Sequence, residues 1–347
     1  MMRSQFTSQN MEDCRRIIRL GSKSFYFASL MLPAQIRAAA TALYAFCRIS
    51  DDIADDPKAN LESVMRLRDR LDAAYAGRPF NHSADKAFSD VVSHYKIPIS
   101  VPNSMIEGFE WDVTGKRYET LSDVIDYSAR VAGTVGVMMS ILMGRRRAQT
   151  LARACDLGVS MQLINIARDV GEDARNGRVY LPAQWLEEES LSQGELIADV
   201  SYSDALGRVV ERLLDTADLI YYRGVTGINE LPGSCQMGIR AAGLVYAEIG
   251  QKVRENGFNS IDTRAYTTKG RKLGLMLQSA RNFLDDTPCD TSEPMPEIEY
   301  LIEAAATEKD EPFGDGEWLI ELFSELEKRD RAYLAREKEQ ASVLIGQ

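Results

Sequence analysis

Two short runs of carboxylates lie inside segments that otherwise have the apolar spacing of helices. Residues 51–56 read Asp-Asp-Ile-Ala-Asp-Asp, and residues 169–173 read Asp-Val-Gly-Glu-Asp. An aspartate inside a helix costs roughly 0.5 kcal/mol relative to alanine, and a glycine such as Gly171 costs up to about 1 kcal/mol. Like charges four residues apart add a few tenths of a kcal/mol of repulsion. Both runs therefore weaken their own helices, which indicates that a cation binds there.

The helical repeat sorts these side chains into faces. At about 100° per residue, Asp51 and Asp55 share a narrow face with Tyr44 and Arg48, whereas Asp52 turns to the side. The second run extends a polar stripe that spans roughly 100° of its helix. The members of this stripe are Gln162, Asn165, Asp169, Glu172 and Asp173.

Two facing acidic stripes need a partner, because buried unpaired carboxylates are very costly. Oxygen ligands without Cys or His favour Mg²⁺, which keeps several waters and bridges carboxylates to phosphate groups; Mn²⁺ is the alternative. The pattern therefore predicts a clamp for magnesium and diphosphate. Alternatively, each run is only a solvated helix face or a cluster that caps a helix.

Composition limits the other functions. The chain has 347 residues, of which 45% are hydrophobic, enough for a large core. Its net charge of −11 argues against nucleic acid as a partner. Five cysteines form no metal or disulfide framework, and no signal peptide is visible, so we expect a cytoplasmic protein. The most apolar stretch, 131–144, is too short to span a bilayer, and any membrane contact should be peripheral.

Helical periodicity without strand alternation predicts an all-α fold. We expect a single catalytic domain over 1–284, an acidic proline-containing linker over 285–316 and a C-terminal amphipathic helix over 317–347. Gly133 and Gly136 allow either close helix packing or room for a ligand, and the methionine-rich segment after them is either cavity lining or core. The expected helices cover 11–20, 36–55, 61–75, a short segment ending near 98, 102–112, 121–144, 148–174, 203–223, 235–256 and 269–284.

Two long motifs resemble the squalene and phytoene synthase family. They are residues 44–55, YAFCRISDDIAD, and residues 162–182, QLINIARDVGEDARNGRVYLP. The resemblance runs from Ser22 to about Leu284. It implies an isoprenoid synthase helical bundle with a central apolar cavity, in which two prenyl diphosphates condense head to head.

The resemblance also implies roles for individual residues. The Mg²⁺ ligands would be Asp51, Asp55, Asp169 and Asp173. Contacts to phosphate, or to these carboxylates, would come from Tyr44, Arg48, Gln162, Asn165 and Arg168. Tyr180 and, more loosely, Tyr246 match tyrosines near the leaving group, and Ser22 and Phe25 match a mobile lip over the first substrate.

Within the family, residues 130–136 and 171–175 are most similar to bacterial members that make phytoene. This implies geranylgeranyl diphosphate as substrate, no need for NADPH, and later carotenoid-pathway enzymes as partners. The alternative in the same class makes squalene or dehydrosqualene from farnesyl diphosphate. The alternative that is not an enzyme is a catalytically inactive helical scaffold or a partner that carries the substrate. The proton-abstracting base, either released diphosphate or a tyrosine, and the oligomeric state stay open.

Overall fold

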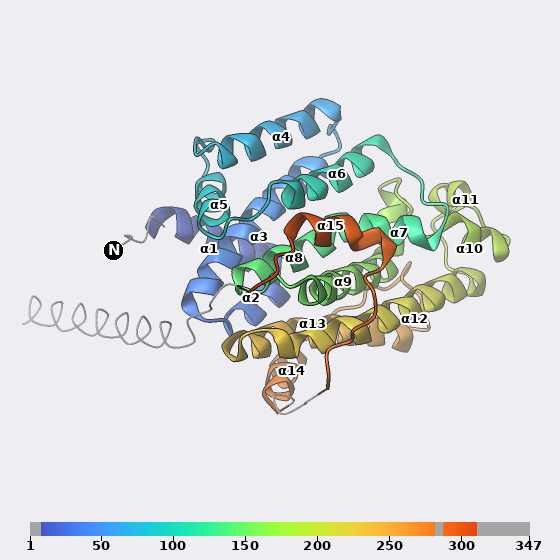
Figure 1. The fold of residues 1–347 in the computed structure, drawn as a ribbon. Helices are drawn as coiled ribbons and strands as arrows, with labels where there is room; N and C mark the ends of the chain where they lie inside the picture. Colours follow the sequence, from blue (N-terminus) through green and yellow to red (C-terminus); the bar gives the residue numbers. More distant parts are fainter. Residues whose placement is uncertain (1–7, 282–286, 311–347) are drawn as a thin grey trace, which may run out of the picture.

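The computed structural model describes residues 8–281 and 287–310, and every regular element in these ranges is a helix (Figure 1). The expected all-α fold is therefore confirmed. In chain order the helices are α1 (Ser8–Gly21), α2 (Lys23–Ser29), α3 (Ala34–Ala54), α4 (Leu61–Tyr75), α5 (Ser83–His94), α6 (Ser100–Thr114), α7 (Leu121–Ser128), η1 (Ala129–Gly133), α8 (Thr134–Leu142), α9 (Ala148–Arg175), α10 (Ala183–Glu188), α11 (Gln193–Ala198), α12 (Asp204–Thr226), η2 (Gly227–Glu230), α13 (Gly233–Glu255), α14 (Lys269–Arg281), η4 (Pro296–Ile298) and α15 (Glu299–Ala305).

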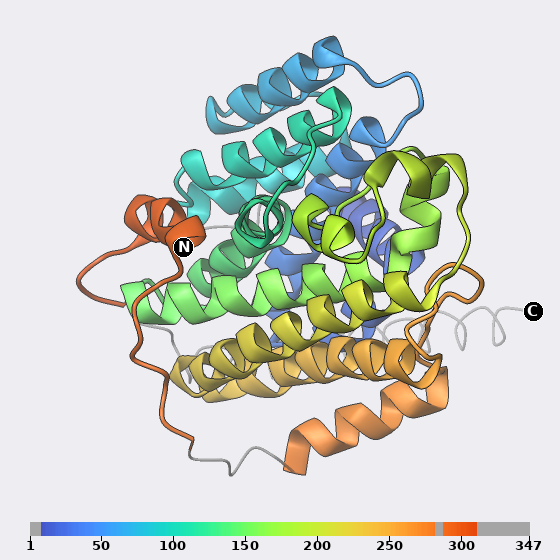
Figure 2. The same ribbon diagram turned by 90° about the vertical axis from the view of Figure 1, so that its right-hand side faces the viewer.

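Helix α9, with 28 residues, runs across the middle of the bundle, and α12, α13 and α14 follow on one side of it (Figure 2). Helix α8 packs against it as well. Good helix formers along α9, such as Ala152, Leu163 and Ala167, are fully buried. Because neighbours cover α9, a polar stripe on it faces the inside of the protein.

The segment 121–144, expected as one helix, is interrupted by the π-helical turn η1. Such a turn carries an extra residue and is often found at functional sites. Just beyond it, a Cβ atom on Gly136 would overlap the carbonyl of Ala154, and one on Gly158 would overlap that of Ala132. Glycine is therefore required where η1 and α8 meet α9, and Gly136 and Gly158 also line a cavity in the bundle, so both expectations for the small residues hold.

The N-terminal helices differ from the expected pattern at one point. Residues 23–29 form α2, which the sequence did not predict, and Ser22 caps it by accepting a hydrogen bond from the Phe25 N–H at 3.2 Å. Capping by serine stabilises a helix start by about 1 kcal/mol. The expected lip residues Ser22 and Phe25 therefore lie at the beginning of a short helix.

The segment 285–316, expected as a linker, is described from 287 to 310, and this part packs on the bundle. Ile298, Leu301 and Ile302 are buried against the core. Their spacing buries one face of η4 and α15, although the surrounding residues are acidic. The expected helix 317–347 lies outside the described residues. Among the described helices, none is long and apolar enough to cross a membrane.

Candidate active site

A cavity of about 700 Å³ lies between α2, α3, α8, α9 and α13. The residues of α9 that line it run from Thr150 to Arg168, which is about 27 Å along the helix axis. Polar and charged side chains gather at the Arg168 end, which we call the mouth. Apolar residues and glycines line the opposite end, which we call the deep end and which includes Leu157, Gly227 and Ile228.

The methionine-rich segment contributes to both the cavity and the core. Met139 and Met143 line the cavity. Met138, Ile141 and Leu142 are fully buried in the core around it. The two expectations for this segment therefore hold for different faces of the same helix.

Helix α3 brings three of the expected residues to the mouth. Tyr44, Arg48 and Asp51 all line the cavity, as their shared helical face requires. The Arg48 guanidinium contacts Asp51 at 3.2 Å and Asp52 at 2.6 Å. Asp55 caps the end of α3 and does not line the cavity. Asp52 is thus the neighbour that helps to hold Arg48.

Helix α9 supplies the facing set. Gln162, Asn165 and Arg168 line the cavity, and the Asn165 amide donates a hydrogen bond to Gln162 Oε1 at 3.3 Å. Asp169 and Asp173 follow on the same helix but do not line the cavity. The structure therefore brings the amides and the arginine of the stripe into the cavity and leaves its aspartates beside the mouth.

Asp169 is held by two arginines. Arg168 and Arg264 each contact both of its carboxylate oxygens, and Arg264 also contacts Glu172 at 3.1 Å. Arg264 comes from the segment between α13 and α14, and it lines the cavity. The charge of Asp169 is thus balanced by guanidinium groups in this structure.

Gly171 makes this arrangement possible. A Cβ atom there would lie 2.8 Å from Ile261 Cα and 2.8 Å from the Ser260 carbonyl oxygen. The Gly171 N–H donates a hydrogen bond to that carbonyl at 3.1 Å. The glycine that weakens α9 therefore lets the segment bearing Arg264 approach it.

Tyr180 belongs to a cluster around a residue that the sequence did not single out. Its hydroxyl donates a hydrogen bond to Asp112 at 2.7 Å, and the Tyr127 hydroxyl donates another at 2.9 Å. The Tyr127 and Tyr180 rings are stacked with their centroids 4.9 Å apart. Tyr180 itself does not line the cavity, whereas Tyr127 does.

Aromatic rings cover the mouth. The Phe25 ring lies 6.1 Å from that of Tyr44 and 5.6 Å from that of Tyr246, between centroids. Tyr246 shares a hydrogen bond with Asn165, and burial raises the pKa of its hydroxyl. Ser22, Phe25 and Tyr246 all line the cavity. The residues expected at the lip and near the leaving group therefore meet at the mouth.

Burial and mutual repulsion raise the pKa of several carboxyls in the same region. Burial, followed by the charge of Asp55, raises the pKa of Asp51 to about 7. Burial, followed by the charges of Asp169 and Glu172, raises the pKa of Asp173 to about 8. These groups lack enough positive charge around them when they ionise, and a bound cation would supply it.

The donor set fits magnesium that is shared with a phosphate ligand. All candidate ligands are carboxylate oxygens, and repulsion among them is a sign that a cation belongs there. Among residues 8–281 and 287–310, however, no group of three His, Cys, Asp or Glu side chains is arranged to hold a metal ion by itself. The remaining ligands would have to come from water and from diphosphate.

Three residues that the sequence analysis left unassigned complete the site: Asp112, Arg178 and Arg264. The Arg178 guanidinium contacts Asp55 at 2.5 Å, and its charge offsets part of the rise that burial causes in the pKa values of Asp112 and Asp173. Arg178 lies inside the second motif, so its place there could have predicted that it belongs to the site. Asp112 and Arg264 lie outside both motifs, and no spacing connects them to the acidic runs.

The sequence matches the squalene/phytoene synthase family over residues 18–271. It is 47% identical to a phytoene synthase of Rhodobacter capsulatus over 330 residues, which cover 93% of this chain and 97% of that one. It is 45% identical to a phytoene synthase of Cereibacter sphaeroides, with 93% and 95% of the two chains covered.

The fold agrees with these relationships. A crystal structure of a dehydrosqualene synthase in complex with a ligand superposes with a TM-score of 0.72 at 28% identity, covering 79% of this chain and 96% of that one. An all-helical bundle with an apolar cavity and a charged mouth defines the class of isoprenoid synthases. This chain belongs to the squalene/phytoene synthase family.

Proposed function

We propose that this chain is a phytoene synthase, a magnesium-dependent prenyltransferase that condenses two geranylgeranyl diphosphates head to head into 15-cis-phytoene. The observation that carries the proposal is the cavity, whose apolar length ends at a mouth lined by Arg48, Arg168 and Arg264 beside the carboxylates. Such a cavity matches a long hydrocarbon with a diphosphate at one end. The similarity to two phytoene synthases supports the choice of product.

The charged residues at the mouth bind and activate the diphosphates. Mg²⁺ held by Asp51 and Asp55 on one side and Asp169 and Asp173 on the other would supply positive charge to the departing diphosphate. Arg48 from α3 and Arg168 from α9 add fixed guanidinium groups. Preorganised cations stabilise the charge that develops on a leaving group.

The apolar cavity controls what happens after ionisation. The first allylic cation alkylates the double bond of the second substrate, and loss of a proton gives a cyclopropylcarbinyl diphosphate. The second diphosphate then leaves, the cation rearranges, and loss of another proton gives the central double bond. Both steps release diphosphate and a proton, so no NADPH is consumed. Walls such as Leu157 and Ile228 keep water away from the cations.

Tyr180 acts through Asp112 in this proposal. Burial raises the pKa of Tyr180 well above its usual value, so its hydroxyl keeps its proton and donates it in the hydrogen bond to Asp112. Asp112 is thereby held close to Arg178. Because the tyrosine is a poor base in this state, released diphosphate is the better candidate for proton abstraction.

The test is to incubate the purified protein with Mg²⁺ and either geranylgeranyl or farnesyl diphosphate, with and without NADPH, and to identify the hydrocarbon. Phytoene from geranylgeranyl diphosphate without NADPH is the expected result. Squalene from farnesyl diphosphate with NADPH would replace the proposal by squalene synthase. If neither diphosphate turns over, the enzymatic proposal is wrong. Omission of Mg²⁺, with Mn²⁺ as a second metal, is the control.

The surroundings of the enzyme are part of the same proposal. The product is a hydrocarbon, so we propose a cytoplasmic enzyme that contacts the membrane surface and passes phytoene to later carotenoid-pathway enzymes. Sedimentation of the protein with lipid vesicles tests the membrane contact. Release of phytoene into vesicles that do not bind the protein would contradict it.

A further inference from the structure

The described residues that follow α14 form a strap along the bundle. We use the name C-terminal strap for residues 287–310, which lie beyond the part of the chain that matches the family, 18–271. The strap crosses α9 and includes α15 (Figures 1 and 2). Three hydrogen bonds hold the strap on the bundle. The Asp290 N–H donates to Thr226 at the end of α12, and Ser122 of α7 donates to Glu297 at 2.6 Å. The N–H of Arg146, just before α9, donates to the Asp310 carboxylate.

The strap covers two charged residues that are completely buried. Arg153 and Asp156 of α9 have no exposed side-chain area, and Arg153 Nε lies 3.0 Å from Asp156 Oδ2. Arg223 of α12 contacts the same oxygen at 3.3 Å. Arg223 is 28% exposed, but Arg153 is not, and a single carboxylate shared with Arg223 would leave the charge of Arg153 incompletely balanced, which is costly in the interior.

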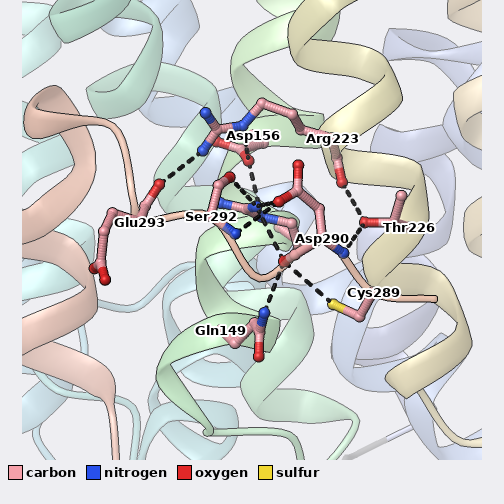
Figure 3. A network of polar contacts seen from close by, with 9 residues as sticks. Gln149, Asp156, Arg223, Thr226, Cys289, Asp290, Ser292 and Glu293 are labelled. Atoms are coloured by element: carbon pink, nitrogen blue, oxygen red, sulfur yellow. Dashed lines mark hydrogen bonds and ion pairs between the residues drawn. The ribbon is translucent and has the colours of Figure 1, made fainter.

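Asp290 of the strap supplies the missing negative charge. Its carboxylate lies 3.2 Å from Arg153 Nη1, so two arginines now face two carboxylates. Its backbone is held as well, since Gln149 donates to its carbonyl at 2.7 Å and its N–H donates to Thr226 at 2.9 Å (Figure 3). Asp290 thereby joins the first turn of α9 to the end of α12.

This cluster lies directly behind the deep end of the cavity. A Cβ atom on Gly227 would overlap Cβ of Arg153, so η2 rests on the aliphatic stem of that arginine. Gly227 and the next residue, Ile228, are cavity wall, whereas Arg153 is not. One turn earlier, a Cβ atom on Gly224 would lie 2.7 Å from the backbone nitrogen of Leu157. The end of α12 therefore packs on the α9 backbone itself, whereas the part of the deep wall at Gly227 packs on the Arg153 stem, including its Cγ at 3.0 Å from the Cβ atom built on Gly227.

We propose that Asp290 is a positioning residue that sets the depth of the cavity, and hence the length of prenyl chain that the enzyme accepts. The ion pair with Asp290 holds the Arg153 stem against Gly227 and so fixes the wall formed by η2. This inference rests on the proposed function, because it assigns a specificity role within that reaction. The strap thus shapes the substrate cavity from behind its wall, through Arg153, without contacting the substrate.

The effect of losing the ion pair depends on substrate length. In Asp290→Asn, Arg153 loses its second negative partner and keeps only the Asp156 carboxylate. Arg223 also contacts that carboxylate, so the Arg153 side chain shifts and the wall at Gly227 loosens. A C20 chain reaches farther toward this wall than a C15 chain does. The reacting groups at Arg168 lie about 22 Å from Arg153 along α9 and are unaffected. Loss of the wall contact of about one methylene group of the substrate corresponds to a roughly ten-fold change in the ratio of kcat/KM for the C20 and C15 substrates.

The test compares kcat/KM for geranylgeranyl diphosphate with that for farnesyl diphosphate, as alternative substrate or competitive inhibitor. For Asp290→Asn we expect the ratio to fall about ten-fold, mainly through the longer substrate. Asp290→Glu, which keeps the charge, should restore most of the ratio. Glu297→Gln is the matched control, because it removes a negative charge from the strap that does not contact Arg153, Asp156 or Arg223, and it should leave the ratio unchanged.

Hydrogen exchange provides a readout that needs no turnover. The amides of 227–230 should exchange faster in Asp290→Asn than in the wild type and in Glu297→Gln. An equal loss of activity toward both diphosphates, with unchanged exchange in η2, overturns the inference and leaves the proposed function intact. If the wild type uses neither diphosphate, the proposed function fails, and exchange in η2 still decides whether Asp290 positions the wall.

Discussion

Arg264 forms a two-pronged contact with Asp169, in which Nε lies 2.9 Å from Oδ1 and Nη2 lies 3.1 Å from Oδ2. Asp169 is one of the carboxylates proposed to bind Mg²⁺, and the arginine engages both of its oxygens. The guanidinium and the metal therefore compete for the same atoms. Arg264 also lines the cavity mouth, so a bound diphosphate offers it another partner.

This competition predicts the behaviour of Arg264→Gln. The substitution removes one of the two arginines that contact the Asp169 carboxylate and leaves Arg168 in place, so the Mg²⁺ concentration for half-maximal activity should fall several-fold. Titration of activity with Mg²⁺ at saturating diphosphate measures it. Arg271→Gln is the control, since Arg271 forms a similar ion pair with Glu248 at 2.8 Å away from the proposed metal ligands. An unchanged Mg²⁺ requirement in Arg264→Gln would contradict the competition.

Neutralising one carboxylate on either helix should abolish turnover without unfolding the protein. Asp51→Asn and Asp169→Asn each remove a proposed metal ligand, and we expect activity to fall at least about 100-fold. Circular dichroism should show nearly unchanged helix content. Asp56→Asn, at an exposed position of the same acidic run, should stay active. Unfolding of both variants would instead indicate that these aspartates are structural.

Gly171→Ala should destabilise the protein although alanine is the better helix former. The propensity gain is up to about 1 kcal/mol, but overpacking against Ser260 and Ile261 costs about 1–3 kcal/mol. We expect a lower urea midpoint and a weaker contact between Arg264 and Asp169.

The matched control for this substitution is Gly194→Ala in α11. No atom lies within 4 Å of a Cβ built on Gly194, so the propensity gain is not offset there. Urea unfolding of Gly194→Ala should therefore show equal or higher stability. A gain in stability in both variants would contradict the prediction, because it would mean that the segment around Ser260 moves away from the added methyl group at little cost.

Asp112 should make stability depend on pH in a defined direction. Burial raises its pKa from 3.8 to about 6, so the folded state binds the proton more tightly than the unfolded state. This contribution to the free energy of unfolding is fully present below pH 3.8 and is lost as the pH rises through about 6.

The variant Asp112→Asn isolates this contribution. Asparagine keeps an acceptor for the hydroxyls of Tyr127 and Tyr180 but does not titrate. Between about pH 4 and pH 6, the Tm of the wild type should therefore fall relative to that of the variant. Parallel Tm curves over this range would show that the pKa of Asp112 does not change on folding.

Local periodicity was sufficient to predict part of the site. The 3.6-residue repeat placed Tyr44, Arg48 and Asp51 on one face of a helix, and these three residues line the cavity. The same repeat placed Asp52 on a different face from these three residues, and Asp52 indeed contacts Arg48 without lining the cavity. Short elements such as α2 and α15 escaped prediction, because their few apolar residues give too weak a periodic signal.

By itself, the sequence determined the all-α class, the long helices, and the two acidic helices with their polar faces, because these features depend on residues within a few turns of one another. Only the tertiary structure decided that Arg264 holds Asp169, that Tyr180 holds Asp112, and that Asp290 closes the charge cluster behind the cavity. These contacts join segments far apart in the chain, and their partners are selected by helix packing, which no local spacing encodes.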